Sequence, residues 1–178
     1  FQDQDDDRNG AVLPFGEHHR FSRGDNLLIF HTAIASPLAD YYRKAAGRKI
    51  LIHHNVTPAR FLAGWNRETA YLAHRARREL EETAPITEAA VADSEFNARE
   101  LAELEFPPAT VIPLIPDFDR LEKEPDKRIV EKYSDGKSTC LFVGRISPNK
   151  KIEDIIRSFA CYQKNFREES RLILIGND

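Results

Sequence analysis

Short apolar runs alternate along this chain with segments that carry helix-start and helix-stop signals. A short continuous apolar run is typical of a strand buried on both faces of a sheet. Strand, helix and strand joined by short links form a βαβ unit, whose two strands are parallel. The pattern therefore predicts an α/β fold built on parallel sheets. The predicted strands are residues 27–30, 50–52, 89–92, 110–115, 139–143 and 172–175.

Helix signals lie between these runs. Ser36 stands directly before Pro37, a pairing typical of an N-cap and the first helical residue. Asn66 and Asn97 each precede a segment with an acidic residue in its first turn, so both are predicted N-caps. The predicted helices cover residues 37–46, 58–62, 67–83, 98–104, 127–133 and 152–163.

A charged segment over residues 118–137 interrupts the alternation and is the predicted interdomain linker. We interpret residues 1–117 as the latter part of an N-terminal Rossmann-like domain and residues 138–178 as the start of a second one. The chain begins in an acidic stretch with little pattern, in which only residues 11–13 predict a short strand. It ends just after a predicted buried strand, so we expect further chain at both ends.

Charge and cysteine content exclude several classes of protein. Twenty-six Lys and Arg against 29 Asp and Glu give a net charge of −3, which offers no electrostatic reason to bind nucleic acid. The sequence has neither a long apolar run nor a secretory leader, so we expect a cytoplasmic protein. Cys140 and Cys161 lie in apolar stretches without metal-ligand spacing and are predicted to be reduced core residues. His18 and His19 lack further ligands nearby, and no metal site is predicted.

A basic loop follows the predicted strand at residues 139–143. It contains Gly144, Arg145 and Lys150 and leads directly into a predicted helix. Ligands of open α/β sheets bind at the carboxyl ends of strands, and a helix N-terminus attracts anions. A guanidinium and an ammonium there suit the oxygens of a diphosphate. From chemistry alone, diphosphate binding and simple solvated loop charges both remain open.

Histidines close two of the predicted strands. His53 and His54 follow residues 50–52, and His31 follows residues 27–30. At a strand's carboxyl end a histidine can face a ligand and either donate or accept a hydrogen bond. An ordinary buried or solvated histidine is the alternative. Ser94 lies where a predicted strand meets a helix, where backbone N–H groups could face an anion or simply begin the helix.

The segment FVGRISPNKKIEDIIRSF at residues 142–159 resembles the motif that opens the C-terminal domain of family 4 (group 1) glycosyltransferases. Earlier segments resemble the end of that family's N-terminal domain, in the same order: ILIHHNVTP, ADSEFNAREL and VIPLIPDFDRL. The resemblance covers residues 25–178. One position departs from it, because Lys151 stands where the family usually has glycine.

The resemblance implies a GT-B fold and transfer of a sugar, with retention and without a metal or other cofactor, from a nucleoside diphosphate sugar to an acceptor hydroxyl. It implies that Gly144, Arg145 and Lys150 bind the donor diphosphate and that His54 contacts the donor sugar as the catalytic residue. The acceptor would be a saccharide or a lipid-linked molecule in cell-surface polysaccharide or glycolipid synthesis, with peripheral membrane association. A non-catalytic GT-B fragment and a nucleotide-sugar epimerase-like relative remain alternatives. The predicted cleft-lining residues are His31, His53, Asn55 and Ser94.

Overall fold

The computed structural model describes residues 23–118, 122 and 124–177. These residues form two compact units. The first contains the described chain up to Val56 together with Leu72–Pro113, and the second contains Thr57–Tyr71 together with the described chain from Leu114 onward. The strand predicted at residues 11–13 and the histidines His18 and His19 lie outside the described residues.

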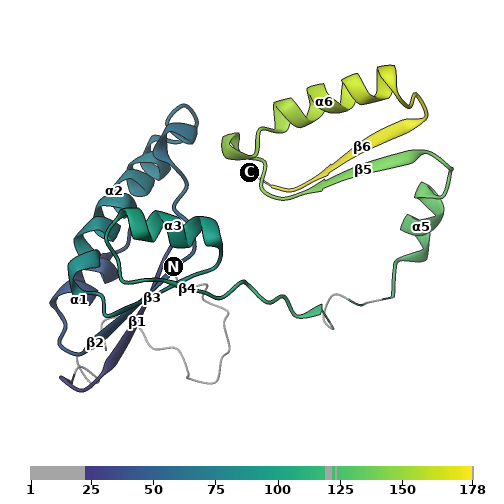
Figure 1. Cartoon of the computed structure of the whole chain (residues 1–178). Helices are drawn as coiled ribbons and strands as arrows, with labels where there is room; N and C mark the ends of the chain where they lie inside the picture. Colours follow the sequence, from purple (N-terminus) through teal and green to yellow (C-terminus); the bar gives the residue numbers. More distant parts are fainter. Residues whose placement is uncertain (1–22, 119–121, 123, 178) are drawn as a thin grey trace. The chain divides into compact units, whose positions relative to one another are not determined.

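The first unit is built on a parallel sheet (Figure 1). Its strands follow one another in the order β1-β2-β3-β4, and every neighbouring pair is parallel. The predicted α/β class and parallel sheet are therefore confirmed, and the arrangement is compatible with a Rossmann-like fold. The strands are β1 (Leu27–Thr32), β2 (Arg48–His53), β3 (Ala89–Ala92) and β4 (Thr110–Val111).

The strand predicted at residues 110–115 is too long, because β4 contains only Thr110 and Val111. Pro113 follows shortly afterwards and has no backbone N–H to donate to a neighbouring strand. The predicted helix over residues 58–62 is also reduced, to the short 3-10 helix η2 (Ala59–Phe61).

The α-helices that precede β4 in the described chain begin at side-chain caps. The Oγ atom of Ser36 accepts a hydrogen bond from the Leu38 N–H at 3.2 Å, and the Oδ1 atom of Asn66 accepts one from the Thr69 N–H at 2.9 Å. Both residues are predicted caps, and the second helix has the predicted bounds. The helices are α1 (Pro37–Lys44), α2 (Arg67–Thr83) and α3 (Glu95–Glu103).

The predicted start of α3 is wrong. The helix is capped by Ser94, whose Oγ accepts from the Asn97 N–H at 3.3 Å, so the helix begins three residues before the predicted one. Asn97 lies inside the helix with only 2% of its surface exposed. Its side chain is used in a contact with Asp93 instead of a cap.

Helices cover one face of the first sheet. Thr32, His53 and Ala92 lie side by side in register, and all three are buried. The side chains two residues earlier on each strand point to the same face and pack against α1, α2 and α3. On the other face Leu27 and Ile29 are about half exposed, at 52% and 53%. The expectation that β1 is buried on both faces is therefore wrong for the described residues.

The second unit contains one parallel strand pair, β5 (Ser138–Val143) and β6 (Ser170–Ile175). They are joined through η4 (Pro148–Lys150) and α6 (Ile152–Asn165), as the predicted βαβ unit requires. The predicted helix in the linker is also present, as α5 (Lys127–Tyr133). The Arg171 guanidinium of β6 lies 5.1 Å from the ring of Tyr133, which attaches α5 to this strand pair.

Both cysteines are exposed, so the prediction that they are core residues is wrong. Cys140 lies on β5, which pairs only with β6 among the described residues, and Leu141 and Val143 beside it are exposed as well. The apolar character of β5 therefore indicates a strand without indicating burial here. No helix in the described part of the chain is long and apolar enough to cross a membrane.

Candidate functional site

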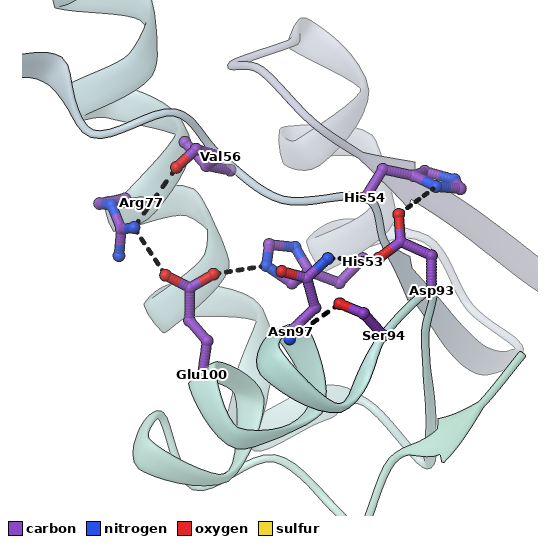
Figure 2. A network of polar contacts seen from close by, with 8 residues as sticks. All are labelled: His53, His54, Val56, Arg77, Asp93, Ser94, Asn97 and Glu100. Atoms are coloured by element: carbon purple, nitrogen blue, oxygen red, sulfur yellow. Dashed lines mark hydrogen bonds and ion pairs between the residues drawn. The ribbon is translucent and has the colours of Figure 1, made fainter. Parts of the chain in front are cut away.

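Three polar side chains form a row at the carboxyl edge of the first sheet. His31 is the penultimate residue of β1, while His54 and Asp93 directly follow β2 and β3. Because side chains alternate along a strand, His31 and His54 fall on the face opposite to that of buried His53. Two histidines adjacent in the sequence are thus separated onto two faces of the sheet. Figure 2 shows His53 and His54 pointing in different directions.

The histidine row is held by close contacts between neighbouring strands. The Nδ1 atom of His31 lies 2.9 Å from the Nε2 atom of His54, and the two rings are nearly parallel at 13°. The other ring nitrogen of His54, Nδ1, lies 3.7 Å from a carboxylate oxygen of Asp93 (Figure 2). The side chain of His54 is 28% exposed, so solvent or a ligand can reach the row.

The carboxylate of Asp93 is itself held from α3. The side-chain amide of Asn97 donates to the Oδ1 atom of Asp93, while the Oδ2 atom faces His54. The amide is buried and the carboxylate is 16% exposed. The position of Asp93 relative to His54 therefore depends on a residue four positions further along the chain.

His53 belongs to a buried network on the covered face. Its Nε2 atom lies 2.7 Å from the Oε2 atom of Glu100, and the Oε1 atom of Glu100 accepts a hydrogen bond from Arg77 at 2.6 Å. Arg77 also donates to the backbone carbonyl of Val56 at 3.3 Å. Figure 2 shows these contacts, which connect the end of β2 with α3 and α2. The network fixes the end of β2, and hence the place where His54 emerges.

Burial lowers the pKa of His31 below its ordinary value of 6.5, and the positive charge that His54 can carry lowers it further. Both effects disfavour the imidazolium form. His31 is therefore neutral near pH 7 and keeps one ring nitrogen with an unprotonated lone pair.

The other two predicted cleft residues, Asn55 and Ser94, lie outside the histidine row. Asn55 is exposed and has a backbone φ of +74°, a left-handed conformation that asparagine tolerates better than most residues. Ser94 is half-buried, and its hydroxyl is used to cap α3. Neither side chain belongs to the row of His31, His54 and Asp93.

The basic loop lies in the second unit, at the carboxyl end of β5. Its backbone is bound to the end of β6 and the residues after it. The Gly144 N–H donates to the Ile175 carbonyl at 2.9 Å, and the Ile146 N–H donates to the Asn177 carbonyl at 2.8 Å. Arg145 and Lys150 are exposed, and neither forms an ion pair or a side-chain hydrogen bond with a described residue. The loop thus offers two cations whose donors are unoccupied by described side chains.

Lys151 completes this loop in a left-handed conformation, with φ +53° and ψ +47°. Non-glycine residues adopt this conformation at an energetic cost. Lys151, which stands where the resembling family has glycine, therefore has a backbone conformation that favours glycine.

Several residues of these clusters are absent from the sequence predictions. Asp93 follows its strand as His54 follows β2, so the edge of the predicted sheet could have indicated it. Glu100 and Arg77 have no comparable local signal, because their contacts join segments 23 to 47 residues apart.

Among the described residues, no group of three or more His, Cys, Asp and Glu side chains is arranged to hold a metal ion. No protein-family model matches the chain, and no curated protein matches it.

Proposed function

We propose that the chain is part of a retaining glycosyltransferase of the GT-B type, which moves a sugar from a nucleoside diphosphate sugar to an acceptor hydroxyl. The observation that carries the proposal is the basic loop between β5 and α6. Arg145 and Lys150 are exposed there without an anionic partner among the described residues. Cations in this position are suited to stabilise the charge that grows on a leaving diphosphate.

The backbone of the same loop supports the family resemblance. A left-handed residue heads α6 at Lys151, where the resembling glycosyltransferases have glycine. Glycine favours this conformation because it lacks a Cβ atom. The lysine therefore keeps the path of the loop that a glycine would take, although its side chain restricts how closely a ligand approaches the backbone at that point.

The histidine row is consistent with a substrate that carries hydroxyl groups. His54 is partly exposed at the carboxyl edge of a parallel sheet, where ligands of such sheets bind. Imidazole nitrogens can accept or donate hydrogen bonds at neutral pH, which suits the recognition of a sugar. In this proposal the row can recognise sugar hydroxyls, and the basic loop can independently bind a diphosphate.

Calorimetric titration of the full-length protein with UDP and with GDP tests the proposal. We expect one of the two to bind, and Arg145→Ala combined with Lys150→Ala to weaken that binding by about 2–4 kcal/mol. A matched control removes one lysine and one arginine charge near the C-terminal end of α6, with Lys164→Ala and Arg167→Ala. Both control residues are exposed, and binding should be unchanged.

The outcomes separate the alternatives. Equal binding by the double variant and the wild type would show that Arg145 and Lys150 are ordinary solvated charges that do not bind the diphosphate. Binding without any sugar turnover would indicate a non-catalytic protein. If a nucleoside diphosphate sugar is isomerised instead of transferred, the protein is an epimerase. Failure to bind any nucleoside diphosphate would reject the proposal.

A further inference from the structure

The hydrogen bond between His31 and His54 restricts where protons can lie in the row. A neutral imidazole carries one N–H and one lone pair. The Nδ1 atom of His31 and the Nε2 atom of His54 are 2.9 Å apart, so one of them is the donor and the other the acceptor. Two arrangements are therefore available to the neutral pair, and they place the remaining lone pair on different residues.

Asp93 decides between the two arrangements. Its Oδ2 atom lies 3.7 Å from the Nδ1 atom of His54. A carboxylate attracts a proton at that nitrogen and repels a lone pair there. His54 therefore carries its proton on Nδ1, and its Nε2 atom accepts a hydrogen bond from the Nδ1–H group of His31. The lone pair of His31 is left on its own Nε2 atom, for which no partner is found among the described residues.

Asn97 fixes the carboxylate in this role. An ionised carboxylate only accepts hydrogen bonds, so the Nδ2 amide group of Asn97 must be the donor to the Oδ1 atom of Asp93. The other amide atom of Asn97, Oδ1, is buried without a hydrogen-bond partner among the described residues. The amide orientation therefore depends on Asp93, and the Oδ2 atom of Asp93 is left to face His54.

We propose that the Nε2 atom of His31 is the proton-accepting nitrogen that this site offers to a ligand hydroxyl, and that Asp93 and Asn97 are positioning residues that set this through the tautomer of His54. The lowered pKa of His31 is consistent with this, because a neutral ring retains the lone pair. Only the identification of the hydroxyl as that of a sugar rests on the proposed glycosyltransferase function.

His53 provides an internal contrast. Its Nε2 atom faces the Glu100 carboxylate at 2.7 Å, and its Nδ1 atom is buried without a partner among the described residues. A buried N–H without an acceptor is costlier than an unused lone pair, so the proton lies on Nε2. The adjacent histidines 53 and 54 are thus expected to carry their protons on opposite ring nitrogens.

Nitrogen-15 NMR of the full-length wild-type protein, labelled at histidine, tests the tautomers directly. The spectra are recorded at pH about 8.5, where an imidazole with an ordinary pKa of about 6.5 is neutral. We expect His31 and His54 to be protonated on Nδ1 and His53 on Nε2. A proton on the Nε2 atom of His54 would overturn the proposal, and this measurement needs no variant to fold.

Chemical modification locates the free lone pair independently. Diethyl pyrocarbonate acylates an accessible, unprotonated imidazole nitrogen, and peptide mass spectrometry gives the rate at each histidine. We expect His31 to react at a rate comparable to that of exposed His74 on α2. His54 should react about tenfold more slowly, because its lone pair accepts the hydrogen bond from His31. Modification of His54 as fast as that of His31 would contradict the proposal.

Asp93→Asn tests the positioning role. Without the carboxylate, the preference for a proton on the Nδ1 atom of His54 should be lost, and His31 should react more slowly with diethyl pyrocarbonate. Asp154→Asn on α6 is the matched control and should change neither result. Tautomers that stay unchanged in the Asp93 variant would remove Asp93 from this role. If the Asp93→Asn variant folds poorly, Asn97→Asp tests the same influence of Asp93 on the tautomer of His54. The tautomers themselves are still read from the wild-type spectrum.

The outcome is separable from that of the proposed function. Nucleoside diphosphate binding through Arg145 and Lys150 can fail while the tautomers of the row are as described. If sugar transfer is observed, His31→Gln should lower kcat/KM by about tenfold or more, because one hydrogen bond to the reacting hydroxyl is lost. His74→Gln should leave kcat/KM unchanged. An equal kcat/KM for His31→Gln and wild type would exclude contact with the reacting hydroxyl.

Discussion

The Nε2 atom of His53 lies 2.7 Å from the carboxylate of Glu100, which joins the end of β2 to α3 across 47 residues of sequence. His53 is fully buried, and the side chain of Glu100 is only 12% exposed. Glu100 also holds Arg77 of α2 at 2.6 Å. A single carboxylate therefore connects a strand end with two helices.

Replacing Glu100 by alanine should lower the free energy of unfolding by about 3 kcal/mol, because His53 and Arg77 lose their common partner in a largely buried place. Urea unfolding followed by circular dichroism measures the change. Glu103→Ala, one turn further along α3 at an exposed position, is the control and should stay within about 0.5 kcal/mol of wild type. Equal effects of the two substitutions would show that the network contributes little.

Lys151→Gly should increase the free energy of unfolding. The residue has a φ of +53°, which costs a side-chain-bearing residue about 1–2 kcal/mol. Glycine relieves that cost but gains entropy in the unfolded chain, so the expected net gain is about 0.5–1 kcal/mol. Thermal or urea unfolding of the variant gives the value.

The neighbouring Lys150 serves as the comparison for this substitution. It belongs to the 3-10 helix η4 and is not among the residues with positive φ. Lys150→Gly should therefore decrease stability slightly. A loss of stability for Lys151→Gly as well would mean that the left-handed conformation is not strained.

Gly47→Ala should be strongly destabilising. Gly47 has a φ of +116°, and an added Cβ atom would lie 2.5 Å from the backbone oxygen of Asn26. Strain of this kind costs about 1–3 kcal/mol before any steric clash is added. Gly24→Ala is the control, since no atom of the described residues lies within 4 Å of its added Cβ atom. Similar unfolding midpoints for the two variants would contradict the expectation.

His31 should make stability fall as the pH is lowered. Its folded-state pKa lies below the unfolded value of 6.5, so the unfolded chain takes up a proton that the folded chain does not. The contribution is complete above pH 6.5 and is lost as the pH falls from there through the folded pKa. Denaturant unfolding at several pH values should show a shallower acid dependence for His31→Gln than for wild type or His74→Gln.

Local chemistry was sufficient to predict most of the secondary structure. Asn66 and the residues that follow it predict α2 with its observed bounds, and Ser36 with Pro37 predicts the start of α1. These signals are local because a cap satisfies backbone groups within one turn of itself. The strands β1, β2, β3, β5 and β6 were likewise indicated by short apolar runs.

Competition between local signals accounts for the errors. Ser94 and Asn97 are both good capping residues, and the sequence does not reveal that Asn97 is needed by Asp93. The apolar run over residues 110–115 indicates a strand, but only two of its residues pair with β3. The exposure of Cys140 shows that burial depends on which elements cover a strand, which its own residues do not encode.

The candidate site divides in the same way. The sequence by itself determined that histidines lie near the ends of β1 and β2 and that a basic loop follows β5, because these depend on neighbours along the chain. Only the tertiary structure decided that His54 lies between His31 and Asp93 while His53 is buried against Glu100. The period of two along a strand separates the adjacent histidines, and the register of β1, β2 and β3 then chooses the partners of each one.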